Sequence, residues 1–206
     1  KTAAGTFSIA ARRIPADEKD AAANAFRTRE TNFQKILARQ LALIAKRNGS
    51  KDRATLEAVA AEFESVVTDF KNSNEETYTA DSLNALALTF NSLGRYSDAI
   101  TRWLEAAAIF KKLGIKTHEQ QCLNDAGFGF QNLGNNTEAL RYFFESLEIK
   151  RKFGTKLTTS KTLGNIGLSQ LALGKSDDAL KSFTESLALA RSDTRTDSEN
   201  ARVVTF

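Results

Sequence analysis

Residues 83–110 read LNALALTFNSLGRYSDAITRWLEAAAIF, and this stretch decides the fold. Its apolar residues recur at spacings of three and four, which is the spacing along one face of an α-helix. Gly94 interrupts the pattern where a left-handed C-terminal cap is favourable. Ser97 and Asp98 follow with side-chain oxygens that suit the start of another helix. The stretch therefore predicts a helix, a tight turn and a second helix.

The same pattern occurs three times, with a period of 40 residues. The second and third copies begin at Leu123 and Leu163. Other aligned sets are Leu93-Gly94, Leu133-Gly134 and Leu173-Gly174; Ala99, Ala139 and Ala179; Trp103, Phe143 and Phe183; and Ile109, Ile149 and Leu189. A two-helix unit of this size cannot bury its own apolar stripe, so the units must stack on one another. The sequence thus predicts an all-α fold, an α-solenoid of helix-turn-helix repeats.

Small residues occupy one position of each first helix, namely Ala87, Gly127 and Gly167. They lie one turn from the aligned alanines of the second helix, so we expect the two backbones of each unit to approach closely there. The openings of the second helices also repeat, as Thr137-Glu138 and Asp177-Asp178. Acidic residues at these places oppose the helix dipole.

The pattern resembles the tetratricopeptide repeat. The residues that carry the likeness in the first unit are Leu83, Leu86, Ala87, Phe90, Gly94, Tyr96, Ala99, Trp103 and Ala106. The 40-residue period is similar to the variant found in kinesin light chains and in polarity adaptors rich in Leu-Gly-Asn. The likeness covers three units, at 74–113, 114–153 and 154–191, and implies a right-handed superhelix. The departures from the pattern are Asn136 and Ser176 for Tyr, Gln170 for an aromatic residue, and Ser146 and Ser186 for the last Ala.

The flanks of the repeats differ from one another. Residues 15–73 predict a long helical hairpin, with a first helix from Pro15 to about Gly49 and a second to about Asn72, which would cap the array as a degenerate unit. The predicted inward stripe of the first helix is Phe26, Phe33, Leu37, Leu41 and Ile44. Residues 192–206 are polar at first and predict a linker or tail. Residues 1–14 are expected to be extended or disordered.

The resemblance implies a function, because the first helices of tetratricopeptide units line an inner groove that binds a partner protein. The implied peptide-binding residues are Asp81, Asn84, Leu88, Asn91, Gln121, Asn124, Phe128, Gln131, Asn132, Lys161 and Leu168. Asn84 and Asn124 are 40 residues apart, so they would form a ladder. A carboxamide has a donor and an acceptor, and can bond the amide and the carbonyl of an extended peptide. Ordinary exposed polar residues on amphipathic helices remain an alternative interpretation of the same positions.

Charge supports a different hypothesis. Residues 1–53 carry 12 Lys and Arg against 5 Asp and Glu, while the remainder of the chain has a net charge of −3. Arg27, Arg29, Lys35, Arg39, Lys46 and Arg47 could bind nucleic acid or an anionic membrane. Their offsets place them around most of the helix circumference, so we consider this function less favoured than peptide binding.

Catalytic and metal-binding patterns are weak. His118 and Cys122 share a helix face, but two ligands do not make a structural zinc site, and the chain has one His and one Cys. We therefore expect no enzyme activity, cofactor, metal or small-molecule substrate. We also expect no membrane-spanning segment and thus a soluble protein. The absence of Met and the apolar residues at 203, 204 and 206 keep open a third hypothesis, a non-catalytic regulatory arm excised from a longer enzyme or signalling protein.

Overall fold

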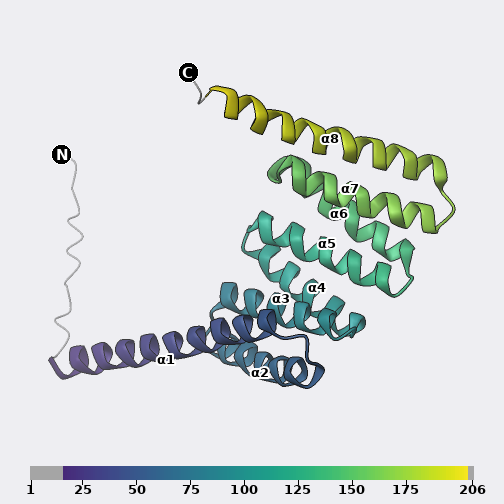
Figure 1. Ribbon diagram of the computed structural model, residues 1–206. Coiled ribbons are helices and arrows are strands. Elements are labelled where there is room, and N and C mark those ends of the chain that lie inside the picture. The colour runs from purple at the N-terminus through teal and green to yellow at the C-terminus, as the bar shows by residue number, and fades with distance from the viewer. Residues whose placement is uncertain (1–15, 204–206) are drawn as a thin grey trace, which may run out of the picture.

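The computed structural model of the chain describes the backbone of residues 16–203 and the side chains of residues 20, 21 and 23–192. The helices in this range are α1 (Ala16–Gly49), α2 (Arg53–Asn72), α3 (Glu76–Ser92), α4 (Tyr96–Lys112), α5 (Lys116–Asn132), α6 (Asn136–Phe153), α7 (Lys156–Ala172) and α8 (Ser176–Val203). Each helix packs mainly on its neighbours in the chain, and together they form one curved array (Figure 1). The predicted all-helical solenoid is confirmed.

The predicted element bounds agree closely at the N-terminal hairpin and differ at the last helix. We predicted a linker from residue 192, and this is wrong because α8 continues to Val203. Residues 192–200 contain neither glycine nor proline, so no residue there stops a helix. The predicted extended segment 1–14 lies outside the described residues. Among the described residues, no helix combines the length and the apolar composition that crossing a bilayer requires.

Glycine makes the turn within each unit. Gly94, Gly134 and Gly174 have φ of 74°, 75° and 73°, the left-handed region that a side chain disfavours. Each second helix begins slightly earlier than expected, as at Tyr96 of α4, so the predicted acidic residues lie in its first turn. Asn135 caps α6 instead, because its Oδ1 accepts from the amide of Glu138.

The small residues of the first helices allow the predicted close approach of the two backbones. A Cβ atom added to Gly127 would lie 2.7 Å from the ring of Phe143 and 3.2 Å from the carbonyl oxygen of Ala139. A Cβ added to Gly167 would lie 2.6 Å from the ring of Phe183. Aromatic rings of the second helices therefore pack directly on glycine backbone in units two and three.

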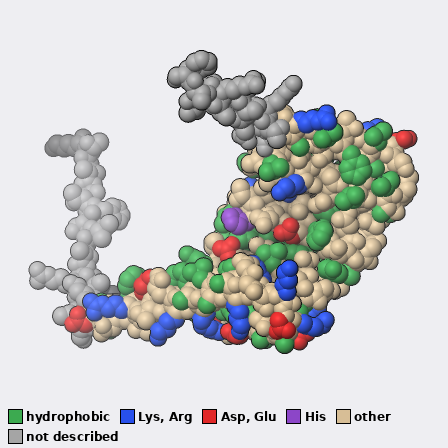
Figure 2. All heavy atoms as spheres, in the orientation of Figure 1, with side chains coloured by type: hydrophobic (Ala, Val, Ile, Leu, Met, Phe, Trp, Pro, Cys, Tyr) green, Lys and Arg blue, Asp and Glu red, His purple; other side chains and the backbone are tan. Residues whose placement is uncertain are grey.

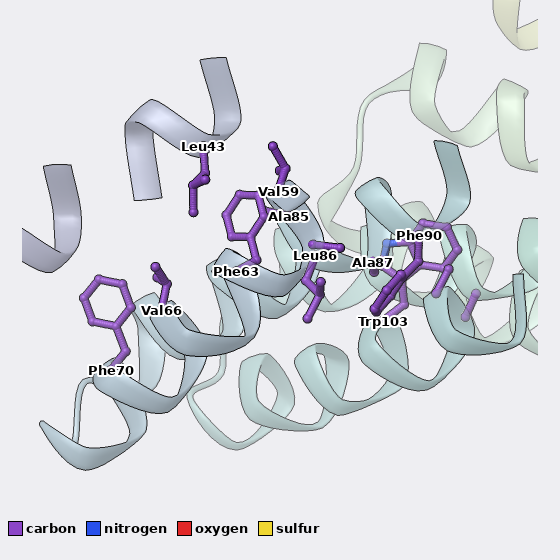
Figure 3. Packing of buried hydrophobic residues seen from close by; sticks show 13 residues of the cluster. Leu43, Val59, Phe63, Val66, Phe70, Ala85, Leu86, Ala87, Phe90 and Trp103 are labelled. Atoms are coloured by element: carbon purple, nitrogen blue, oxygen red, sulfur yellow. The ribbon is translucent and has the colours of Figure 1, made fainter. Parts of the chain in front are cut away.

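Buried apolar residues continue along the array to α7, and the cluster at its N-terminal end follows the apolar stripes of α2 to α4, together with part of α1. Phe63, Phe90 and Trp103 are almost fully buried, and Figure 3 shows Leu43 of α1 beside Phe63 and Val59 of α2. The predicted stripe of α1 is only partly correct. Phe33, Leu37 and Ile44 contact the core, whereas Phe26 and Leu41 are 69% and 58% exposed. The prediction missed Leu43, which is buried, and Ile36, which packs against the core.

Residues that depart from the repeat pattern have specific partners. Ser146 donates to the carbonyl oxygen of Gln120 at 2.7 Å, and Ser186 donates to that of Ser160 at 2.7 Å. Each hydroxyl thereby ties a second helix to the first helix of its own unit. In unit two, Phe130 and Tyr142 stack at 5.3 Å between ring centroids. In unit three, the aligned residues are Gln170 and Ser182. The hydroxyl of Ser182 donates a hydrogen bond to Oε1 of Gln170 at 2.7 Å.

Candidate functional site

A cleft of about 390 Å³ opens where α1, α3 and α5 meet. It lies on the hollow side of the array, where Figure 2 shows hydrophobic side chains along α1. The lining residues are Leu37, Gln40, Leu41, Ile44 and Arg47 of α1, Tyr78, Asp81, Asn84, Ala85 and Leu88 of α3, and His118 and Gln121 of α5. The cleft therefore combines apolar side chains, most of them from α1, with polar groups from α1, α3 and α5.

The cleft brings together four of the predicted site residues, Asp81, Asn84, Leu88 and Gln121. The other predicted residues do not line it; they are Asn91, Asn124, Phe128, Gln131, Asn132, Lys161 and Leu168. Sequence reasoning missed the whole contribution of α1, because we assigned its apolar residues to the core. Leu41 and Ile44 line the cleft and are three residues apart. A second apolar stripe on α1 would have this spacing, and recognising it could have indicated the cleft wall.

The two residues of the proposed asparagine ladder already have partners. Asn84 Oδ1 accepts from Trp103 Nε1 at 3.1 Å, and Asn124 Oδ1 accepts from Thr162 Oγ1 at 2.9 Å. Asn124 also donates from Nδ2 to Asp125 Oδ1 at 3.3 Å. One lone pair of each carbonyl oxygen is thus engaged in packing within the array, and Asn84 Nδ2 is the freer of the two amide groups.

The remaining predicted carboxamides also differ in their surroundings. Gln131 donates from Nε2 to Ser169 Oγ at 3.0 Å, which links unit two to unit three. Asn91 Oδ1 is buried and has no hydrogen-bond partner among the described residues. Asn132 is exposed. Structural hydrogen bonds therefore account for Gln131, while Asn132 is available to solvent.

Apolar side chains lie at one aligned position of all three first helices. Leu88 is half-buried, Phe128 is 40% exposed and Leu168 is 52% exposed. The adjacent aligned positions Ala87, Gly127 and Gly167 are buried between helices. Phe128 and Leu168 thus present apolar surface to solvent, whereas Leu88 packs partly against the core.

The charges of the cleft are Asp81 and Arg47. Partial burial raises the pKa of Asp81, and nearby His118 offsets part of that rise. Burial lowers the pKa of Arg47, whose Nη1 donates to the carbonyl oxygen of Ala85 at 3.2 Å. Its Nη2 donates to Asn48 Oδ1 at 2.9 Å. The guanidinium is therefore directed to α3 and to its own helix, and Asp81 has no ion pair with any described residue.

A second polar group lies at the junction of units two and three. Lys150 is 7% exposed and donates from Nζ to Thr162 Oγ1 at 2.7 Å. Thr162 donates to Asn124, and Asn124 donates to Asp125, so four side chains form a chain of hydrogen bonds. Burial raises the pKa of Asp125 to about 6 and lowers that of Lys150 to about 8, while their opposite charges counteract both shifts.

The pair of His118 and Cys122 does not form a nucleophilic site. Cys122 is buried, and burial together with the negative charges of Asp125 and Asp81 raises the pKa of its thiol far above the usual range. The ring of His118 instead packs at 4.9 Å from that of Phe110. No group of three or more His, Cys, Asp or Glu that could hold a metal occurs among the described residues.

Most basic residues of α1 that we considered for nucleic acid or lipid have partners within the protein. Arg29 pairs with Glu75 at 3.2 Å, Arg39 with Asp69 at 2.7 Å and Lys46 with Glu62 at 3.9 Å. Arg47 donates to the carbonyl oxygen of Ala85 and to Asn48, as described above. These pairs reduce the positive charge that α1 presents to a phosphate backbone.

Two family profiles, both described as tetratricopeptide repeat, match residues 119–192 and 79–113. No curated protein matches the chain. The fold is similar to that of apo RapI, with 17% identity and a TM-score of 0.67 over 87% of this chain and 66% of RapI. It is also similar to a putative kinesin light chain of Podosopora anserina with nearly identical TPR-like repeats, with 13% identity and a TM-score of 0.58 over 89% of this chain and 99% of that chain.

Proposed function

Because the chain belongs to the tetratricopeptide repeat family, we propose that it is a non-catalytic scaffold that binds a peptide segment of a partner protein in its inner groove. Members of this family generally bind proteins. The proposal here is the binding mode, with the first helices α3, α5 and α7 as the contact surface and α1 as an additional wall.

The observation that carries the proposal is the aligned apolar row of Leu88, Phe128 and Leu168, of which Phe128 and Leu168 are exposed. The row recurs in all three repeat units, so it would offer one apolar contact per unit to an extended segment. An isolated exposed apolar residue would need no explanation, but apolar residues at one aligned position of all three repeat units suggest a shared role. Polar groups flank this row, including Asn84 and Gln121 in the cleft. This combination suits a peptide, whose backbone is polar and whose side chains are partly apolar.

The test uses a random 12-residue peptide library displayed on phage and selected on the immobilised protein. The groove variant is Phe128→Gln with Leu168→Gln, and both residues are at least 40% exposed, so the fold should persist. The control variant is Phe144→Gln with Leu180→Gln, which changes two exposed apolar residues of the second helices. Circular dichroism melts of all proteins check that each is folded.

We expect the wild type and the control to bind the selected peptides equally, and the groove variant to bind them at least about tenfold more weakly. That loss corresponds to removing the burial of two large apolar side chains. If the groove variant and the control bind every selected peptide alike, the groove is not the binding surface. If the folded wild type selects no peptide, the binding mode is wrong altogether.

A further inference from the structure

Asp81 is the one acidic residue in the lining of the cleft between α1, α3 and α5. Its side chain is half-buried and makes no hydrogen bond or ion pair with any residue in the described part of the chain. Among the described residues, only the nearby His118 offsets part of the cost of burying this charge. A carboxylate in such a place costs free energy unless a partner pairs with it.

The repeat itself does not require an acid at this position. The aligned residues of units two and three are Gln121 and Lys161, so the same helix position accommodates an acid, an amide and a base. Packing within the repeat therefore does not explain why an acid occupies position 81. The neutral Gln121 lies beside it in the cleft, while Lys161 is exposed one unit further along.

The other charged groups of the cleft leave the carboxylate unpaired. Arg47 directs its guanidinium to the carbonyl oxygen of Ala85 and to Asn48. His118 lies near enough to lower the pKa of Asp81 but forms no ion pair with it, and its Nδ1 lies 3.2 Å from Thr117 Oγ1. The lining from α1 includes the apolar side chains of Leu41 and Ile44.

We propose that this cleft is the specificity pocket of the groove and binds a Lys or Arg side chain of the partner peptide at Asp81, with an apolar side chain of the same peptide on the α1 wall. The charge of the carboxylate selects the cation, and the aliphatic part of a Lys or Arg side chain suits the apolar surface around it. The inference rests on the proposed function, because it names the partner chemistry of that groove. It also gives the overlong helix α1 a part in binding, since α1 supplies the apolar wall.

The experiment repeats the peptide selection on wild type, Asp81→Asn and Asp81→Lys. Glu148→Lys is the matched control, because Glu148 is an exposed acid of the second helix α6. We expect wild-type peptides to be enriched in Lys or Arg at one position, with an apolar residue within two positions of it. Selection on Asp81→Lys should lose this enrichment, and selection on Glu148→Lys should retain it.

A fluorescein-labelled peptide from the wild-type selection then gives affinities. We expect Asp81→Lys to weaken binding at least about tenfold and Asp81→Asn about threefold to tenfold, with Glu148→Lys within about twofold of wild type. Replacing the basic residue of the peptide by norleucine should weaken its binding to wild type by the same factor as Asp81→Asn does. The same replacement should not weaken binding to Asp81→Asn. The combination of the norleucine peptide with Asp81→Asn tests the proposal even if Asp81→Lys is unfolded.

Two results would separate the two proposals. Peptides that depend on Phe128 and Leu168 but show no preference for Lys or Arg would overturn the role of Asp81 and leave groove binding intact. Peptides that are insensitive to Phe128→Gln with Leu168→Gln would overturn groove binding, and the pocket assignment with it.

Discussion

The junction between units one and two and the junction between units two and three occupy aligned positions but use opposite chemistry. At the first, Phe110 is 1% exposed and packs with Cys122, Leu123 and Leu83 in an apolar cluster. At the second, Lys150 takes the position of Phe110 and Thr162 takes that of Cys122. The buried contact becomes a hydrogen bond of 2.7 Å between Nζ and Oγ1.

The difference shows that the array accommodates either an apolar contact or a hydrogen-bonded one at this position. The helices continue in the same order through both junctions (Figure 1). A polar contact is selective, however, because each buried donor needs its acceptor and a missing partner is costly. The apolar junction should tolerate apolar substitutions that conserve volume, whereas the polar junction should tolerate only changes that keep donor and acceptor matched or replace both.

The largest expected effect comes from breaking the apolar junction with Phe110→Ala. Removing a fully buried ring loses its burial and leaves a cavity, so the free energy of unfolding should fall by about 3–5 kcal/mol. Urea unfolding followed by circular dichroism measures this change. Phe153→Ala, at an exposed position of the other junction, is the control and should change stability by less than about 0.5 kcal/mol. A loss below about 1 kcal/mol for Phe110→Ala would contradict the role given to the apolar cluster.

A smaller effect is expected from breaking the polar junction with Thr162→Val. This change removes the acceptor of the buried Lys150 ammonium and should cost about 1–3 kcal/mol. The double variant Lys150→Met with Thr162→Val replaces both partners by apolar groups and should recover most of the loss. The same urea titrations report the interaction. A double variant less stable than Thr162→Val alone would show that the junction depends on the ammonium itself.

The turns at the two junctions allow a sharper comparison of backbone. Gly114 has φ of 72°, the aligned Asn74 has φ of 57°, and Gly154 is extended with φ of −92°. Gly114→Ala should cost about 1 kcal/mol, since a left-handed conformation is unfavourable for alanine. Gly114→Asn should cost less, because asparagine already adopts this conformation at position 74. Equal melting temperatures for the two variants would contradict this account.

The smallest effect concerns pH. The pKa of Asp125 is raised to about 6 in the folded protein, above its unfolded value, so this group favours folding at low pH and loses that contribution as pH rises through about 6. The Asp125→Asn variant has no titrating carboxyl at this position, so it lacks this contribution to stability at low pH. Between pH 5 and pH 7 the stability of the variant relative to wild type should therefore rise, by at most about 1 kcal/mol. Urea unfolding of both proteins at the two pH values tests this, and a relative stability that falls would contradict it.

Much of the fold follows from the sequence because a repeated pattern constrains each helix three times. Leu83, Phe90 and Trp103 are buried as their spacing predicts. The prediction fails where repetition gives no guidance. At α1 two apolar stripes overlap, so Leu41 was assigned to the core although it faces the cleft, and beyond Arg191 polar composition was taken for a linker although no residue stops the helix.

The candidate site was less predictable, because its polar groups are partly engaged by residues far along the chain. Asn84 and Asn124 are aligned, yet one accepts from an indole in its own unit and the other from a hydroxyl in the next unit. Trp103 and Thr162 decide these contacts, and neither residue repeats. A periodic pattern predicts which positions face the same way, but the partner of each side chain depends on non-periodic residues.

The different pairs within units two and three also bear on how near-copies avoid exchanging partners during folding. Phe130 stacks on Tyr142, while Gln170 accepts a hydrogen bond from Ser182. If α5 paired with α8, Phe130 would face a hydroxyl, and if α7 paired with α6, Gln170 would face an aromatic ring. Each mismatch leaves a polar group or a ring without its complement, so these pairs discriminate against wrong assembly of otherwise interchangeable hairpins.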